Sequence, residues 1–178
     1  KRRQNRRRKK KGRVKHMLAL VKYGKGPKET ELRDVPVPKI GEDDLLIEVK
    51  AAGICGSDIA YDNGDHPDHL NCPVVLGHEF SGVVSKVGAN VKDWKVGDRV
   101  VSDNTGYVCG KCFACTTGQY LSCPDRKGLG YGMDGGFTDY VKITGSLLSK
   151  NPNTLFRIPE GVSFDEAAIL DPICNAYK

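Results

Sequence analysis

Two short, glycine-flanked clusters of potential metal ligands stand in the first half of the chain. The first is Cys-Gly-Ser-Asp at 55–58, and the second is Gly-His-Glu at 77–79. Thiolate, imidazole and carboxylate are all donors that zinc accepts, and three protein donors leave one position open, as in catalytic zinc sites. The alternative is a buried free cysteine and an unrelated His-Glu pair. We predict that Cys55, His78 and Glu79 bind a catalytic metal ion.

Four more cysteines follow at a spacing that is typical of a metal site. Cys109, Cys112, Cys115 and Cys123 give C-x2-C-x2-C-x7-C, and four thiolates can close a tetrahedral structural zinc shell. The competing interpretation is an iron–sulfur cluster, because Pro124 follows the last cysteine as in the ferredoxin run C-x2-C-x2-C-x3-C-P. The last spacing here is four residues too long for that run, so the pattern favours zinc. A disulfide pair is the remaining alternative.

The basic residues are concentrated at the N-terminus. Residues 1–16 hold eleven of the 28 Lys and Arg and no acid, so the remaining 17 basic residues face 22 acidic ones, a net charge of −5. This tail has no apolar periodicity and is predicted to be disordered. It could tether nucleic acid or act as a nuclear signal. Because Met17 begins a strand pattern, we favour a tail that is not part of the native domain, and nucleic acid is not an expected partner.

Hydropathy and cysteine usage indicate the compartment. No apolar run approaches the roughly 18 residues of a membrane span, and the apolar stretch 17–21 is too short for the core of a signal peptide. The seven cysteines are odd in number, and four of them have metal-site spacing, which favours reduced thiols. We therefore expect a cytoplasmic protein without a membrane partner.

Short strands with frequent turns must position these ligands. The strongest alternation puts Leu45, Ile47 and Val49 on one face, after which Gly53 delivers Cys55 into a loop. This rhythm predicts a compact, mostly β, barrel-like domain with short helices. The expected strands and extended segments are 17–21, 31–35, 45–51, 82–88, 97–101, 137–143 and 156–159.

Two further features concern the edges of the candidate site. His66 and His69 lie in a polar loop and are expected to be solvated rather than to bind metal. Ser163 and Glu166 form the capping pattern S-x-x-E, which predicts a helix through residue 170 that presents Asp171.

The motifs taken in order resemble the zinc-dependent medium-chain dehydrogenase/reductase family of alcohol, polyol and threonine dehydrogenases. The resemblance runs from Met17 to about Tyr177 and implies that residues 17–178 form a GroES-like β-barrel catalytic domain with a zinc-binding cysteine lobe. It also implies one catalytic and one structural Zn²⁺, held by the two ligand sets above. The matching motifs are Gly53-Ile54-Cys55-Gly56-Ser57-Asp58, Gly77-His78-Glu79 with Gly82, Gly97-Asp98-Arg99-Val100, the four-cysteine lobe, and Asp134-Gly135-Gly136-Phe137 with Tyr140.

The resemblance implies a zinc-dependent, NAD(P)-linked oxidoreductase. It would oxidise a small secondary alcohol (a polyol, sugar alcohol or threonine-like compound) to a ketone by hydride transfer from a zinc-bound alkoxide. Ser57 would begin the proton relay, and Asp171 would bind the metal directly or through water. Ala60 stands where the family's relay histidine is expected, so Tyr61 or water would take that role, or the proton would leave directly. The alternative is a non-catalytic zinc-binding barrel module.

No dinucleotide-binding fingerprint is found in the chain. After Gly128 and Gly130 the third fingerprint position is Met133, and the pattern predicts no strand before it and no helix after it. We therefore expect the family's Rossmann domain beyond Lys178, with NAD or NADP bound there, and interpret the chain as a fragment. The full-length protein is expected to be a homo-oligomer.

Overall fold

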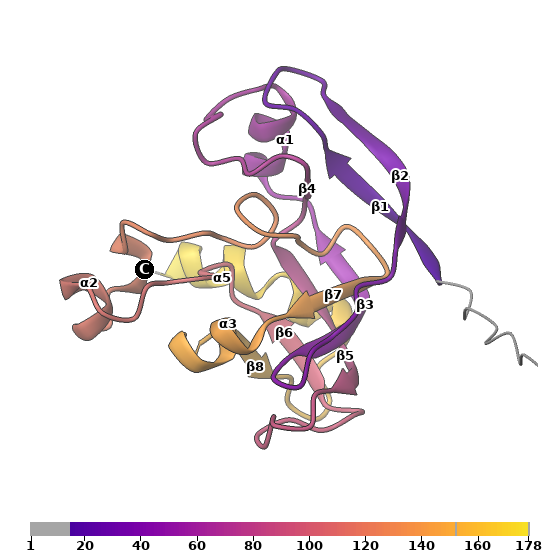
Figure 1. Ribbon diagram of the computed structural model, residues 1–178, viewed down its shortest axis with the longest axis vertical. Coiled ribbons are helices and arrows are strands. Elements are labelled where there is room, and N and C mark those ends of the chain that lie inside the picture. The colour runs from indigo at the N-terminus through magenta and orange to yellow at the C-terminus, as the bar shows by residue number, and fades with distance from the viewer. Residues whose placement is uncertain (1–14, 152, 178) are drawn as a thin grey trace, which may run out of the picture.

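A computed structural model describes residues 15–151 and 153–177 (Figure 1). The basic tail expected over residues 1–16 lies almost wholly outside the described residues. Its last residue, His16, begins the first strand. Within the described residues no helix has the length and apolar character needed to cross a membrane.

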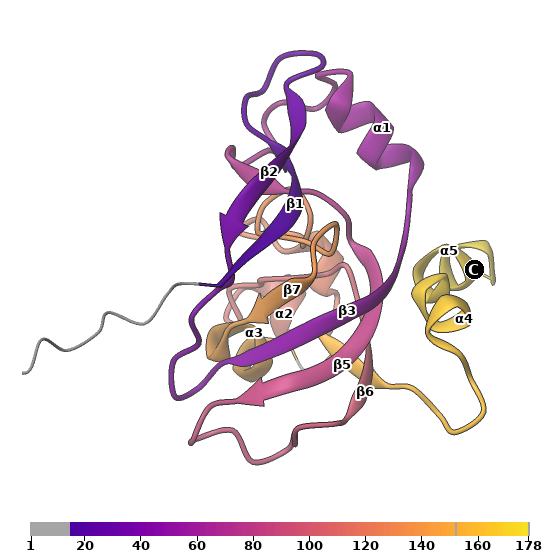
Figure 2. The same cartoon turned by 90° about the vertical axis from the view of Figure 1, so that its right-hand side faces the viewer.

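Two antiparallel sheets make up the body of the molecule (Figure 2). The smaller sheet has the order β2-β1-β4 and the larger the order β7-β3-β5-β6-β8. This confirms the expected mostly β architecture. The strands are β1 (His16–Lys22), β2 (Thr30–Pro36), β3 (Leu45–Gly53), β4 (Val74–Val75), β5 (Glu79–Val87), β6 (Arg99–Ser102), β7 (Tyr140–Ile143) and β8 (Leu155–Arg157).

The main core lies inside the larger sheet. Leu45 and Ile47 of β3 are fully buried, as the alternation predicts, but Leu46 is only 1% exposed as well. The pairing of β3 with β5 shifts register between Leu46 and Ile47, and such an irregularity bends and twists a strand. Strict alternation is therefore broken there, and three consecutive residues are buried. Their neighbours in this core cluster include Phe80, Val84, Val100, Leu129, Val141, Ile143, Leu147 and Leu155.

Gly82 allows strands β3 and β5 to approach each other closely. A Cβ atom at this position would collide with the backbone carbonyl oxygen of Glu48 and would lie 2.8 Å from the side chain of Ile47. Only glycine fits between the two backbones without moving them. This pairing also sets Gly53 opposite Glu79, at the end of the sheet where the candidate ligands meet.

The helices are short, and two of them differ from the sequence prediction. The segment after Gly53 was expected to be a loop, but α1 begins directly after Cys55. The capping box of Ser163 and Glu166 is confirmed, yet the helix ends at Ala168 and a new one begins at Leu170. Proline in a helix interior removes a hydrogen bond, so Pro172 fits only in a first turn. The helices are α1 (Gly56–Asp62), α2 (Phe113–Thr116), η1 (Tyr120–Ser122), α3 (Gly145–Lys150), α4 (Phe164–Ala168) and α5 (Leu170–Tyr177).

The segment with α2 and η1 forms a lobe that projects from the barrel on the left of Figure 1. We call residues 107–127 the cysteine lobe; its two ends pair with each other through a bridge between Tyr107 and Lys127. Val108, Cys115 and Cys123 are its buried cluster, against which Tyr120 packs. Phe113 is 79% exposed, so this large apolar side chain does not contribute to the buried cluster.

We expect Gly82→Ala to lower the free energy of unfolding by about 1–3 kcal/mol, because the added methyl group must push β3 and β5 apart. The measurement is urea unfolding followed by circular dichroism. Gly56→Ala is the matched control, since no heavy atom lies within 4 Å of a Cβ built there. Equal stability of the two variants would contradict the proposed tight approach of the strands.

Candidate metal centres

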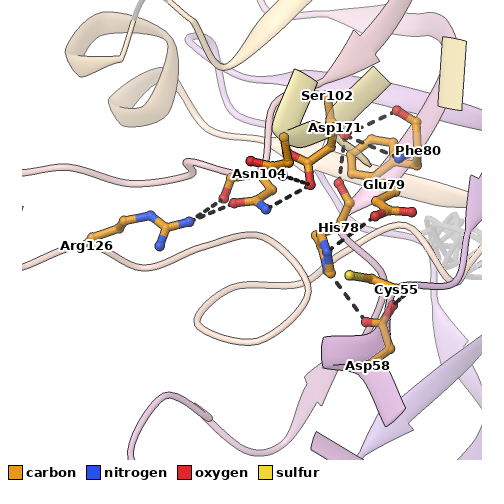
Figure 3. A network of polar contacts seen from close by, with 10 residues as sticks. Cys55, Asp58, His78, Glu79, Phe80, Ser102, Asn104, Arg126 and Asp171 are labelled. Atoms are coloured by element: carbon orange, nitrogen blue, oxygen red, sulfur yellow. Dashed lines mark hydrogen bonds and ion pairs between the residues drawn. The ribbon is translucent and has the colours of Figure 1, made fainter. Parts of the chain in front are cut away.

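The sheet brings the first ligand set together. Cys55 follows the end of β3, while His78 and Glu79 lie at the start of the adjacent strand β5. One donor atom from each of the three side chains lies within 4.8 Å of the other two (Figure 3). His78 and Glu79 are 3% and 5% exposed, and Cys55 is partly buried. The structure thus brings together the three predicted ligands, although Cys55 and Glu79 are 24 positions apart in the sequence.

Asp58 orients the imidazole of His78. Its Oδ1 atom lies 3.6 Å from His78 Nδ1, and its Oδ2 atom accepts a hydrogen bond of 2.9 Å from the backbone N–H of Cys55. Metal-binding histidines commonly turn their second nitrogen toward a carboxylate in this way. The sequence analysis quoted Asp58 within a motif but gave it no role. Its position three residues after a ligand, in the first turn of α1, was the available signal.

The two nitrogens of the His78 ring face different carboxylates. His78 Nδ1 and Asp58 Oδ1 have no hydrogen-bond partner among the described residues, but they lie 3.6 Å apart, just beyond hydrogen-bond distance, so a small shift would pair them. His78 Nε2 faces Glu79 Oε1 at 3.9 Å, too far for a hydrogen bond. A dication between the donors would fit this arrangement, and a thiolate, an imidazole and a carboxylate suit zinc.

Gly53 makes room for the carboxylate of Glu79. A Cβ atom at Gly53 would lie 2.5 Å from Glu79 Oε2. The two residues are cross-strand partners, so the missing side chain leaves a space that the carboxylate occupies. This is the physical reason why a glycine precedes the ligand cysteine by two positions.

The backbone at His78 is fixed from two sides. The Ser102 hydroxyl donates to the His78 carbonyl oxygen at 3.0 Å, and Ser102 is itself 2% exposed. Gly77 has a φ angle of +89°, and a Cβ there would lie 2.6 Å from the ring of Phe137. Glycine is therefore needed both for the backbone conformation and for the contact with Phe137.

The acids and the thiol around His78 favour its protonated form. Burial lowers the pKa of the imidazole, but Asp58 and then Cys55 outweigh this effect and raise the pKa to about 9. A metal ion bound to Nε2 must displace that proton, because the metal ligand is the neutral imidazole. Metal binding at this group is therefore coupled to pH.

The four lobe cysteines also converge. Their sulfur atoms all lie within 4.8 Å of one another, with Cys112 Sγ at 3.5 Å and Cys109 Sγ at 3.9 Å from Cys115 Sγ. A tetrahedron with Zn–S bonds of about 2.3 Å has edges of about 3.8 Å. The sulfur positions fit that shape, and all four are free thiols rather than disulfides.

Backbone amides of the lobe support a thiolate at Cys109. Hydrogen bonds from the N–H groups of Lys111 and then Cys112 lower the pKa of this thiol to about 6. The pKa of Cys115 is raised instead. Burial is the main cause, and the hydrogen bond with Cys112 is the second. Amides directed at sulfur are a common surrounding for metal thiolates, because they stabilise the negative charge.

The other predicted residues lie around this group rather than in it. Asp171 accepts hydrogen bonds from Asn104 at 3.3 Å and Asn175 at 3.4 Å, and it is not among the three donors that converge. Ser57 is partly buried in the first turn of α1. His66 and His69 are exposed and stack on each other, with their ring centroids 5.5 Å apart.

Comparisons with known proteins agree with this architecture. Residues 41–153 match the alcohol dehydrogenase GroES-like domain. The chain belongs to this family. The barrel and cysteine lobe are therefore those of the zinc-dependent medium-chain dehydrogenases, as the sequence motifs suggested.

Individual relatives cover the same region. The chain is 47% identical, over 91% of its length and 46% of the relative's, to an uncharacterized zinc-type alcohol dehydrogenase-like protein of Escherichia coli. It is 42% identical to D-arabitol-phosphate dehydrogenase of Enterococcus avium, over 89% and 43% of the two chains. The solved structure of 2R,3R-butanediol dehydrogenase from Bacillus subtilis superposes with a TM-score of 0.72 at 31% identity, covering 88% and 44%. The chain thus spans about half the length of the relatives it matches.

We expect Asp58→Asn to weaken zinc binding at the Cys55–His78–Glu79 group by about 10–100-fold. Loss of a carboxylate that orients a metal-binding histidine commonly has an effect of this size. The amide removes the charge that orients His78 and can present an N–H toward it. The measurement is competition with a chromophoric chelator. Asp65→Asn is the control, because Asp65 is exposed in the loop after α1. Unchanged affinity in Asp58→Asn would contradict the orienting role.

We also expect zinc affinity at this group to fall as the pH is lowered from 9 to 7, by about tenfold per unit for the His78 proton. The sign follows from the pKa of about 9, below which His78 is protonated before the metal binds. Imidazole NMR of the zinc-free protein should show His78 titrating near that value, and lower in Asp58→Asn. A titration of His78 near 6.5 in the wild type would contradict the raised pKa and the expected pH dependence of zinc affinity between pH 7 and 9.

Proposed function

We propose that this chain is the catalytic domain of a zinc-dependent, NAD(P)-linked dehydrogenase that oxidises a secondary alcohol to a ketone. The single observation that carries the proposal is the incomplete donor set of Cys55, His78 and Glu79, three donors within 4.8 Å of one another. A structural site would close its shell with a fourth protein ligand, as the cysteine lobe can. The substrate class that the motifs favour is a polyol, a sugar alcohol or a threonine-like hydroxy compound.

The zinc ion, when bound, acidifies the hydroxyl group of an alcohol, and a nicotinamide cofactor accepts the hydride. The protein's own residues supply position and electrostatics. Asp58 holds the His78 ring by its Nδ1 side, which leaves Nε2 directed toward the other donors. Burial of His78 and Glu79 keeps bulk water from competing for those donors.

We assign the proton-handling role to Ser57. It lies two residues after Cys55 in the first turn of α1, and a hydroxyl can accept one proton while it donates another. Ala60 carries no group that could continue the relay. Burial raises the pKa of the nearby Tyr61 to about 12, so this phenol stays protonated and can pass a proton on only as a hydroxyl. Tyr61 or water would thus connect Ser57 to solvent.

Asp171 is proposed to act on the substrate or the metal through water. Asn104 and Asn175 each donate to its carboxylate, which holds it at the edge of the site (Figure 3). It is partly buried at the start of α5. An acid in that position can accept a hydrogen bond from a second hydroxyl group of a polyol.

Metal content per chain is the first test, measured by mass spectrometry on the wild type and on Cys112→Ser. We expect two zinc ions in the wild type and one in the variant, because the variant breaks only the lobe's shell. His78→Ala should likewise lose one, and should abolish polyol oxidation in the complete protein that carries this chain. One zinc in the wild type and none in Cys112→Ser would favour a non-catalytic barrel module instead.

A further inference from the structure

Arg126 is a positively charged side chain whose place the proposed reaction does not explain. Its Nε atom donates to the Thr105 carbonyl oxygen at 3.1 Å, and its Nη2 atom donates to the backbone and side-chain oxygens of Asn104 at 3.2 and 2.7 Å. All of these acceptors are neutral. No ion pair to Arg126 is found within residues 15–151 and 153–177. The guanidinium is thus held by hydrogen bonds to neutral oxygens and lies 5.8 Å from the centroid of the Tyr131 ring, with no carboxylate paired to it among these residues.

Arg126 lines a cavity of about 490 Å³ between the cysteine lobe and the loop after α1. Lys127, His69 and Asn71 also line it, and Asp68 is its one acidic lining residue. Lys127 is exposed, and its amine has no hydrogen-bond partner among the described residues. Cations therefore outnumber acids around this cavity, although the chain from residue 17 onward is acidic overall.

Arg126 connects this cavity with the surroundings of the candidate metal centre, although none of Cys55, His78 and Glu79 lines the cavity. Asn104, which anchors Arg126, is two residues from Ser102, whose hydroxyl holds the His78 carbonyl (Figure 3). The phenol of Tyr61 lies close enough to Arg126, Asp58 and Cys55 to interact with the charge of each. On the other side, the ring of Tyr131 lines the cavity and lies 5.3 Å from the ring of Tyr61 in α1, the helix that begins after Cys55. A molecule several bonds long could therefore reach both places.

We propose that this cavity binds a phosphate ester group on the alcohol substrate, with Arg126 as the residue that determines specificity. The inference rests on the proposed function, because it places the reacting hydroxyl at the Cys55–His78–Glu79 group. A fixed guanidinium matches two phosphate oxygens with parallel hydrogen bonds, and Lys127 adds a second charge for a dianion. A neutral polyol would leave both cations without a counter-charge. The substrate class is therefore a phosphorylated polyol or sugar alcohol.

The test is calorimetric binding to the zinc-loaded chain with three probes: sorbitol 6-phosphate, sorbitol and inorganic phosphate. We expect the ester to bind about tenfold or more tightly than sorbitol, as a charged hydrogen-bonding pair would give. Inorganic phosphate should bind more weakly than the ester, because it makes no contact at the metal. Added NaCl should weaken binding of the ester but not of sorbitol.

Three variants locate the effect. Arg126→Gln should reduce ester affinity to the level of sorbitol, and Lys127→Gln should reduce it several-fold, with sorbitol binding unchanged in both. Lys86→Gln, an exposed lysine on β5, is the matched control and should behave as the wild type. Zinc content and thermal unfolding check the fold. Because the Lys127 side chain is exposed, its variant tests the site even if Arg126→Gln is destabilised.

Equal affinity for the ester and sorbitol would overturn the inference, as would an Arg126→Gln variant that weakens both equally. Inorganic phosphate binding as tightly as the ester would also overturn it, since the site would then recognise a free anion. The proposed function fails separately. Oxidation of sorbitol by the complete protein with no preference for the ester refutes the phosphate site alone. Ester binding that depends on Arg126, without any turnover, refutes the dehydrogenase and leaves the anion site.

Discussion

The pairing of β3 with β5 is the constraint on which the candidate site depends. It sets Gly53 opposite Glu79 and so brings the residue after β3, Cys55, against the first residues of β5. The two strands can approach only because Gly82 and Gly53 have no side chains where a backbone carbonyl and a carboxylate must fit. Metal ligands that are 23 and 24 residues apart in sequence become neighbours through ordinary antiparallel hydrogen bonding.

Several polar side chains are buried where β3 and β5 meet beside Cys55. His78, Glu79 and Asp58 are each at most 5% exposed, and one carboxylate oxygen and one ring nitrogen have no partner among the described residues. Such an arrangement is costly for a folded chain unless something compensates the charge. The high pKa of His78 expresses the same fact, since a proton partly balances the surrounding acids. A metal ion would balance them more fully, and this links the fold to the chemistry.

The cysteine lobe has little buried apolar surface to stabilise it. It extends away from the barrel with a buried cluster of Val108 and two cysteines, and its larger apolar side chains Phe113 and Leu121 are exposed. Too little apolar surface is buried there for a core of ordinary size, so we infer that a metal would supply much of its stability. Its last residues are Arg126 and Lys127, which line the cavity beside the loop after α1. Under the proposed phosphate site the lobe would therefore take part in substrate recognition as well as in structure.

Much of this protein followed from local sequence. The existence of strands β1 and β3, the S-x-x-E box at Ser163, the convergence of the two sets of potential ligands and the family could be predicted, because spacing, capping and donor chemistry act over a few residues. The sequence analysis did not predict the helix after Cys55, because glycine and serine are poor helix formers. The capping role of Asp58 can be recognised only once Cys55 is known to be the N-cap of α1. The contact of Asp58 with His78, the space at Gly53 and the anchoring of Arg126 on Asn104 are decided by tertiary structure alone. Each joins segments that no periodicity relates, and only the register of β3 against β5 and the fold of the lobe bring them together.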